Sequence, residues 1–283
     1  MVGGEELSDV RITNTNGESI ILGNQAPIFL EAIDGVGNIP VELENQKSPN
    51  QDGLTYINNT FSSRDISIEG IIISKQKPNE VMEIRRKIQK VLNPKLGEVT
   101  IKYLDKEIKA IVEATPTFPT AGKGLFYQKY LINLICHSPF WLDSYYESSE
   151  MSYIMGGIKF NLRLPSKFSN RGFKRKAINS GDVDTPVKIE FIGPATNPSV
   201  TNETTGEVIK VNRELGDSDV LSICTSFGKK YVKINGENAF HYIDLDSSFW
   251  SLVPGENILS YKSNNDSINT RVKVSWKNRY IGL

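Results

Sequence analysis

Most of this 283-residue chain alternates between apolar and polar side chains with a period of two. Val99, Ile101 and Tyr103, for example, are separated by single polar residues. Successive side chains of a strand point to opposite faces, so this period predicts strands with one buried and one solvated face. The chain is therefore predicted to be mainly β and antiparallel. Further alternating runs lie at 66–73, 108–112, 130–136, 187–191 and 272–276.

One segment has the period of a helix instead. Val81, Ile84, Ile88 and Val91 recur at spacings of three, four and three residues, which places them on one apolar stripe. Pro94 disfavours helical geometry in the residue before it, so the helix is expected to end there. A single helix among strands is expected to pack against one sheet.

The composition changes at residues 143–153, where the chain reads DSYYESSEMSY and is polar, acidic and aromatic. The following half contains short apolar runs with frequent turn signals, a pattern typical of an antiparallel β-sandwich. We therefore predict an N-terminal domain over 1–147, a β-sandwich or barrel-like fold with one α-helix. A C-terminal antiparallel β-sandwich is predicted over 148–275.

Charge and hydropathy argue against several classes of protein. Lys and Arg together number 33, as do Asp and Glu, so the formal net charge is zero. Proteins that bind nucleic acid usually carry a basic excess. No run of 18 apolar residues is present, so no membrane span is expected. The N-terminal MVGGEELSDV lacks the basic and apolar segments of a secretory signal, and we expect synthesis in the cytosol.

No enzyme motif stands out. The chain lacks HExxH, CxxC, GxSxG and GxxxxGK[ST]. Gly35-Val36-Gly37 begins like a dinucleotide fingerprint, but no third glycine follows and Pro40 interrupts it, so it is interpreted as a loop. The sequence therefore predicts no catalytic residue, no metal ligand and no cofactor site.

The pair Cys136-His137 is the sharpest catalytic candidate, with His241 as a further partner for a nucleophile. Consecutive strand residues point to opposite faces, so these two side chains are expected to diverge. Cys136 continues an apolar face and is predicted to be a small core residue. His137 is then expected to face water or another domain or subunit. Both Cys136 and Cys224 are expected to be buried, reduced thiols.

A basic run, KFSNRGFKRK, occupies residues 167–176 and contains no acidic residue. The favoured interpretation is a solvated loop, because charge runs are usually solvated. The alternative is a patch that meets an acidic partner surface or passing nucleic acid. The residues of this candidate patch are Lys167, Arg171, Lys174, Arg175 and Lys176.

Aromatic pairs occur at Phe140-Trp141, Tyr145-Tyr146 and Phe249-Trp250. Core packing is their more frequent use, but exposed aromatics on a β-sandwich also stack sugars. This leaves a carbohydrate-binding module as an alternative, with Trp250 as the residue to test.

Several stretches, taken in order, resemble the distal tail protein (Dit) family of long-tailed phages that infect Gram-positive bacteria. FSSRDISIEGII is similar to an Arg-containing strand of the family, and the helix ending Leu-Asn-Pro precedes a hairpin as in the family. The stretches that carry the resemblance lie at 61–72, 92–94, 134–142, 178–193, 247–261 and 274–283.

The resemblance implies a structural role in a phage or prophage tail. Family members form a hexameric ring at the tail end, made by N-terminal domains, with galectin-like sandwiches projecting outward. The ring joins the tail tube to the tail-tip hub protein, supports receptor-binding proteins and leaves a channel for DNA. The location implied is the tail tip of the virion, after synthesis in the bacterial cytoplasm. In this architecture, residues 276–283 form a terminal strand that returns to the N-terminal domain.

Pro139 ends a strand because it cannot donate to a β-ladder. Phe140 and Trp141 follow it and are predicted to anchor the joint at which the chain leaves the first domain. Two other functions remain as alternatives at this point: an adhesion module that binds host-surface carbohydrate, and a hydrolase that uses Cys136.

Overall fold

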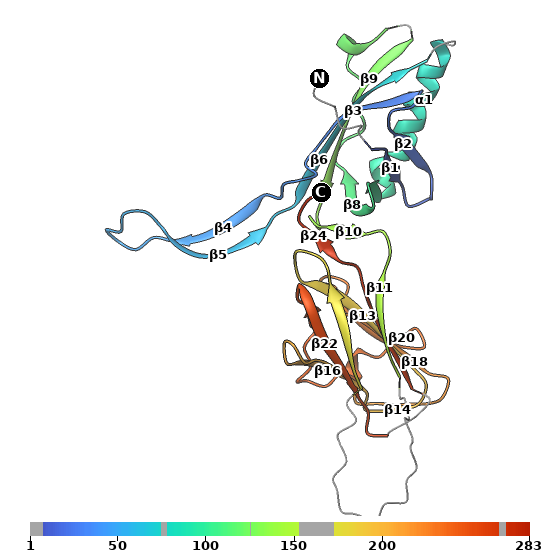
Figure 1. Ribbon diagram of the computed structural model, residues 1–283. Helices are drawn as coiled ribbons and strands as arrows, with labels where there is room; N and C mark the ends of the chain where they lie inside the picture. The colour runs from blue at the N-terminus through green and yellow to red at the C-terminus, as the bar shows by residue number, and fades with distance from the viewer. Residues whose placement is uncertain (1–7, 75–77, 125, 153–172, 266–269) are drawn as a thin grey trace, which may run out of the picture. The chain divides into compact units, whose positions relative to one another are not determined.

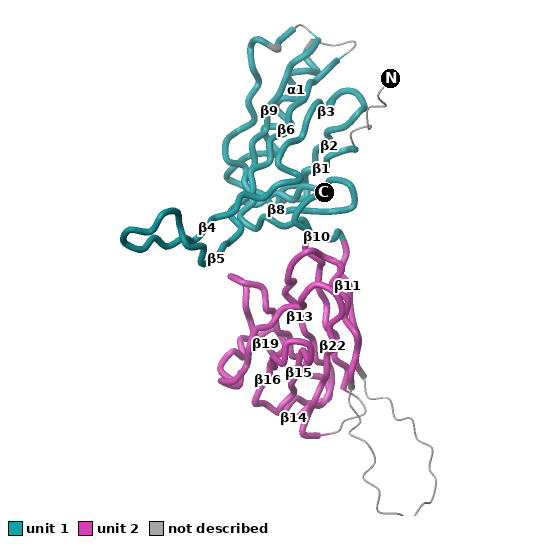
Figure 2. Tube along the Cα trace, turned by 60° about the vertical axis from the view of Figure 1, so that its left-hand side comes forward, with its two compact units in different colours: residues 1–144, 280–283 teal, residues 145–279 magenta. Residues whose placement is uncertain are grey.

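The computed structural model describes all residues except 1–7, 75–77, 125, 153–172 and 266–269. The chain divides into two compact units, shown in Figure 2. Unit 1 consists of Met1–Ser144 together with Tyr280–Leu283, and unit 2 of Tyr145–Arg279. The chain thus leaves unit 1, builds unit 2 and then re-enters unit 1. The predicted mainly β fold with multiple antiparallel sheets is confirmed.

Unit 1 is built on one large antiparallel sheet with the strand order β2-β1-β7-β8-β9-β6-β3 (Figure 1). Two short strands extend it, β10 (Trp141–Asp143) and β24 (Arg279–Tyr280), the second lying where the chain re-enters unit 1. The seven strands of the main path are β1 (Val10–Thr13), β2 (Ser19–Leu22), β3 (Ile28–Asp34), β6 (Arg64–Ile73), β7 (Glu98–Tyr103), β8 (Lys106–Val112) and β9 (Tyr127–Cys136).

Side-chain alternation places the core of unit 1 as the sequence predicts. Ile101 pairs with Ile108 across the predicted hairpin, and both side chains are buried. Along β9 the even-numbered residues from Gln128 to Cys136 are buried. The inward faces of these strands contribute to one continuous apolar cluster.

The helix α1 (Pro78–Val91) lies beside the sheet of unit 1 (Figure 1). Its predicted stripe of Val81, Ile84, Ile88 and Val91 is buried in the core cluster, which confirms the helical period. Two short 3-10 helices complete this unit, η1 (Pro94–Leu96) and η2 (Thr120–Gly122). α1 is the only α-helix among the described residues.

A two-stranded hairpin, β4 (Val41–Gln46) with β5 (Thr55–Phe61), extends from unit 1 as an arm (Figure 1). The two strands pair only with each other, and every residue of both strands is exposed. The arm leaves the unit after β3 and returns directly into β6.

Unit 2 contains two antiparallel sheets, ordered β11-β23-β13-β18-β19-β20 and β12-β22-β15-β16. Phe191 from the first sheet and Tyr261 from the second pack with their ring centroids 5.8 Å apart, and both belong to one core cluster. This arrangement is a β-sandwich. Its larger strands are β11 (Glu147–Ser152), β12 (Phe173–Asn179), β13 (Thr185–Ile192), β15 (Ser199–Asn202), β16 (Glu207–Lys210), β18 (Val220–Cys224), β19 (Tyr231–Ile234), β22 (Gly255–Lys262) and β23 (Arg271–Trp276).

The remaining elements of unit 2 are short and lie in its connections. β14 pairs with β17, and β21 pairs with β13. Their bounds are β14 (Ala195–Thr196), β17 (Glu214–Leu215), β20 (Glu237–Asn238), the 3-10 helix η3 (Phe240–Tyr242) and β21 (Ser251–Leu252).

Candidate assembly site

The arm has one apolar face. Val41 lies directly opposite Phe61, and Leu43 lies two residues further along the same face of β4. Tyr56 shares this face, because its hydroxyl accepts a hydrogen bond of 2.6 Å from the Asn59 side chain opposite Leu43. Leu43 is 61% exposed and Tyr56 is 56% exposed. Covering the exposed parts of these apolar side chains is worth about 1 kcal/mol each.

The opposite face of the arm is polar. Glu42 and Glu44 alternate with the apolar residues of β4 and therefore point the other way. Glu42 accepts a hydrogen bond of 2.8 Å from the Ser62 hydroxyl. A register shift between Glu44 and Asn45 leaves Ile57 as an extra residue on β5, which is a β-bulge. The arm is thus an amphipathic ribbon with no protein layer on either face.

The root of the arm is fixed by Arg64, the first residue of β6. Its side chain is fully buried. Nε donates to the Pro139 carbonyl at 2.8 Å, and Nη1 donates to the carbonyls of Gly35 and Val36, both at 2.7 Å. Nη2 donates to the carbonyl of Ile281. One guanidinium therefore joins four parts of unit 1: the loop that enters the arm, the strand that leaves it, the segment after β9 and the C-terminal segment.

The partners of Arg64 are all backbone carbonyls, with no carboxylate among them. Burial lowers the pKa of its guanidinium, but arginine begins far above neutrality and stays charged. A buried charge is tolerated only when its donors are satisfied. Without the four carbonyls, the Arg64 guanidinium would be a buried charge without acceptors. Without the guanidinium, the four carbonyls would lose their shared hydrogen-bond donor.

Glycine is required where the entry loop of the arm meets its neighbours. Gly35 has a φ of +84°, and a Cβ there would lie 1.9 Å from the carbonyl oxygen of Asp65. Gly282 approaches Gly37 so closely that a Cβ would lie 2.8 Å from the Gly37 carbonyl oxygen. The C-terminal segment therefore packs closely against the Gly35-Val36-Gly37 loop.

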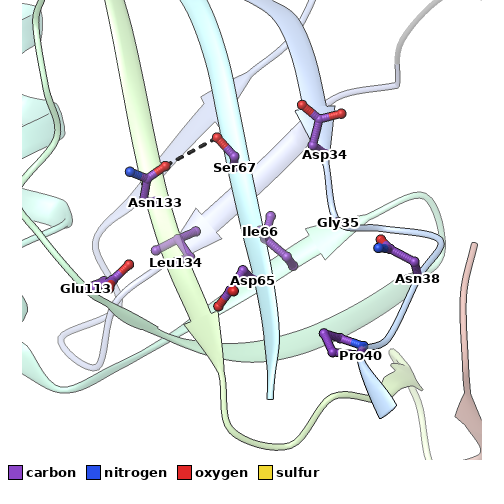
Figure 3. Close-up of a pocket in the computed structure, with 10 residues that line it drawn as sticks. All are labelled: Asp34, Gly35, Asn38, Pro40, Asp65, Ile66, Ser67, Glu113, Asn133 and Leu134. Atoms are coloured by element: carbon purple, nitrogen blue, oxygen red, sulfur yellow. Dashed lines mark hydrogen bonds between the residues drawn. The ribbon is translucent and has the colours of Figure 1, made fainter. Parts of the chain in front are cut away.

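A hollow of about 560 Å³ opens beside this root (Figure 3). Asp34 comes from the end of β3, Asp65 from β6 and Glu113 from the residue after β8. The Ser67 hydroxyl and the Asn133 side chain close one wall with a hydrogen bond of 3.3 Å. The hollow is acidic. Within the residues that the structure describes, no group of three or more His, Cys, Asp or Glu side chains is arranged to hold a metal ion.

The three predicted joint residues all lie at this root. Pro139 is buried, and its carbonyl accepts from Arg64. Phe140 packs edge-on against Phe61 at the end of the arm, with ring centroids 5.6 Å apart. Trp141 is fully buried in the core of unit 1, and its Nε1 donates to the Val36 carbonyl at 3.0 Å. The role of these residues as a joint between domains stays a prediction.

Cys136 and His137 diverge. Cys136 is buried in the core of unit 1, whereas His137 is exposed. Burial raises the pKa of the Cys136 thiol to about 12, and the charge of Arg64 opposes this shift only in part. Cys224, which was expected to be buried, is half-buried on the sheet of unit 2, since it lies on the outward side of β18. Both thiols are free.

We expect Cys136 to be inert in the folded protein. With a pKa of about 12, roughly one thiol in 10,000 is ionised at pH 8. Iodoacetamide at pH 8 should therefore modify Cys224 at least 100-fold faster than Cys136, as followed by mass spectrometry of tryptic peptides. Cys136→Ser should cost about 1–2 kcal/mol of stability because it buries a hydroxyl, with Cys224→Ser as the control. Rapid modification of Cys136 in the native protein would contradict this.

The basic run is only partly described. Lys167 and Arg171 lie outside the described residues, and Lys174, Arg175 and Lys176 lie on β12. Lys176 forms an ion pair of 2.9 Å with Glu256, and Lys174 lies 3.8 Å from Glu203. Two of the described cations are thus already neutralised within unit 2. The partner patch stays a prediction.

The aromatic residue proposed for sugar stacking is not available for it. Trp250 is 1% exposed and belongs to the core of unit 2. Its neighbour Phe249 is half-buried at the surface. The interpretation of Trp250 as a sugar platform is wrong, because the alternation in this segment turns the indole inward.

Two parts of the site are missed by the periodicity of the sequence. The arm carries a signal, the alternation Val41-Glu42-Leu43-Glu44, but it is short and flanked by polar residues. Arg64 carries no local signal of burial, since a charged residue before an apolar strand is ordinarily solvated. Only the resemblance of 61–72 to an Arg-containing strand marks it.

Two protein-family models match the chain. The phage tail protein RIFT-related domain matches residues 15–136, and the C-terminal domain of the siphovirus-type tail component matches residues 180–280. No curated protein sequence matches significantly. The first match falls within unit 1, and the second covers most of unit 2.

Solved structures share the fold over nearly the whole chain. The Dit protein of phage SPP1, described as a paradigm of the hub adsorption apparatus in phages that infect Gram-positive bacteria, is 13% identical with a TM-score of 0.68. That comparison covers 95% of this chain and 98% of the SPP1 chain. A chain of the phage P2 baseplate in its activated conformation with calcium is 10% identical with a TM-score of 0.54, covering 96% and 98%.

Proposed function

Because the chain belongs to the siphophage distal tail protein family, we propose that it forms a hexameric ring at the tip of a phage tail. The N-terminal domain makes the ring in this proposal, and the C-terminal sandwich serves as the outward-facing part. The chain acts by assembly and carries no catalytic activity. Among the residues that the structure describes, no helix has the length and apolar character needed to cross a bilayer.

The proposed ring joins the tail tube to the tail-tip hub protein and supports receptor-binding proteins. Its central channel lets DNA pass without sequence recognition, in keeping with the zero net charge of the chain. The place of action is the tail tip of the virion, after synthesis in the cytoplasm of the bacterial host. The likeness to a hub protein and to a baseplate chain supports this assignment.

The observation that supports self-assembly is the exposed apolar face of the arm. A two-stranded hairpin is at best marginally stable alone in water, and contiguous exposed apolar side chains mark interaction surfaces. The apolar face of the arm, formed by Val41, Leu43, Tyr56 and Phe61, stays exposed in the single chain, although Phe61 packs edge-on against Phe140 at the end of the arm. We infer that a neighbouring copy covers it. A contact of one surface with a different surface on the next copy closes into a ring when the rotation is right.

The experiment is to measure the mass and shape of the purified protein. Light scattering should give six copies of 31.7 kDa, about 190 kDa, and negative-stain microscopy should show six-fold rings, in solution or on tail tubes. A protein that stays strictly monomeric and binds neither tail tube nor hub protein would contradict the proposal.

A further inference from the structure

Unit 2 carries an exposed aromatic surface that the proposed ring does not use. It comprises Phe227, Phe240, Phe249 and Lys230, and we call it the Phe-Lys patch. Phe227 and Lys230 come from the connection between β18 and β19, Phe240 from η3, and Phe249 from the segment before β21. The Lys230 Nζ lies 5.9 Å from the ring centroid of Phe227 and 5.2 Å from that of Phe249.

The base of the patch is preformed. Phe240 and Phe249 are stacked with centroids 5.6 Å apart and an interplanar angle of 14°, and Phe249 also packs against the core of unit 2. Phe227 lies near Lys230 and is 94% exposed, and Phe240 is 41% exposed. With about 200 Å² for a phenylalanine, these two rings expose roughly 270 Å² of apolar surface. Apolar patches of a few hundred Å² on a soluble domain are often functional.

The charge of the patch is unbalanced. Several lysines elsewhere in unit 2 form ion pairs: Lys188 lies 2.7 Å from Glu190, and Lys210 lies 2.8 Å from Asp244. Lys230 forms no ion pair with any described residue. The patch therefore presents phenyl rings beside an ammonium group, and it favours a ligand that brings apolar groups and a carboxylate together.

We propose that the Phe-Lys patch is a docking surface for an acidic, apolar segment of another tail protein. The assignment rests on the proposed tail function. Apolar side chains of the segment pack against Phe227 and Phe240, and a carboxylate of the segment meets Lys230. Phe227 is expected to contribute the largest share of the binding free energy, because buried aromatic side chains dominate the energetics of interfaces.

A second copy of this chain fits the patch less well. The arm is its most prominent exposed segment and carries both apolar and acidic residues, but on opposite faces. Glu42 and Glu44 point away from Leu43, so the arm cannot present carboxylates and apolar groups to one surface. The arm of a second copy therefore does not meet the requirement, and we assign the docking segment to a different protein.

The test places a photo-crosslinker at the most exposed ring. Phe227→p-benzoylphenylalanine keeps an aromatic side chain where 94% of the surface is free, so the fold is retained. Tails carrying this variant are irradiated, and the crosslinked peptides are sequenced by mass spectrometry. The expected product joins residue 227 to an acidic, apolar segment of a different tail protein. The matched control is Ile178→p-benzoylphenylalanine, at an exposed apolar position of β12 on the other sheet, which should not give that product.

Phe227→Ala and Lys230→Glu provide a second measurement, made in tails without the crosslinker. Each should lower the amount of the identified partner protein in purified tails at least tenfold by quantitative mass spectrometry, with normal rings in negative stain. A crosslink to another copy of this chain, a crosslink to no protein, or glycan binding lost in Phe227→Ala would overturn the proposal. So would loss of the rings themselves in these variants. If the two variants form normal rings and retain the partner protein at the wild-type amount, the docking proposal is refuted and the proposed function is not. If the wild-type protein forms no rings, the proposed function itself is refuted.

Discussion

Leu43→Asp is expected to abolish ring assembly while leaving each subunit folded. Leu43 lies at the middle of the apolar face of the arm and is 61% exposed in the single chain. Its replacement costs a free subunit little, because no core contact is lost. In the ring, a carboxylate at this position is buried without a partner, and each interface loses several kcal/mol. Every subunit of a closed ring carries the same defect, so the loss is repeated around it.

The measurement is sedimentation velocity over a range of concentrations, with circular dichroism and thermal melting to check the fold. Assembly should require at least 100-fold more protein than in the wild type. Gln46→Glu is the matched control, since it adds one negative charge on the polar face of the same strand. Rings formed by Leu43→Asp at wild-type concentration would show that the arm lies outside the interface.

Arg64→Ala is expected to destabilise unit 1 by about 3–5 kcal/mol, because it removes the one side chain that donates to four carbonyls. The variant leaves the carbonyls of Gly35, Val36, Pro139 and Ile281 without their shared donor. An unsatisfied buried carbonyl costs about 1–3 kcal/mol, and partial entry of water offsets some of the sum. Arg64→Lys should recover less than half of the loss, because an ammonium on a flexible stem cannot reproduce the planar fork.

Urea unfolding followed by the fluorescence of Trp141, with Trp250→Phe and Trp276→Phe to isolate its signal, measures this effect in unit 1. Arg11→Ala is the control, because Arg11 is exposed on β1 of the same unit and its loss should change stability by no more than about 0.5 kcal/mol. A loss below about 1 kcal/mol in Arg64→Ala would mean that the four carbonyls find other donors.

Periodicity predicts those elements whose pattern is set by burial. The α1 stripe, the hairpin of β7 with β8 and the inward face of β9 each have one buried face, so the sequence records which side is apolar. The same argument separates Cys136 from His137, because adjacent strand residues point to opposite sides. It also shows why Cys136 is a core residue without reference to any motif.

The candidate assembly site is harder to predict because its determinants are not local. The arm has no buried face in a single chain, so burial within that chain does not account for its pattern. Arg64 bonds to residues 29, 28, 75 and 217 positions away, and no window of sequence brings these together. The interpretation of Trp250 as a sugar-stacking residue is wrong for a related reason, since the sequence of an aromatic pair in a loop does not reveal which ring turns inward.

The position of Ile281 among the partners of Arg64 bears on the order in which the protein is made. Unit 1 is interrupted by the whole of unit 2, and the Ile281 carbonyl is synthesised only after Tyr145–Arg279. During translation, the Arg64 guanidinium therefore lacks one of its acceptors, the Ile281 carbonyl, until the second domain has been synthesised. A subunit whose synthesis stops within unit 2 never completes its first domain. The hydrogen bonds of Arg64 at the root of the arm are thus complete only in a subunit in which both domains have been synthesised.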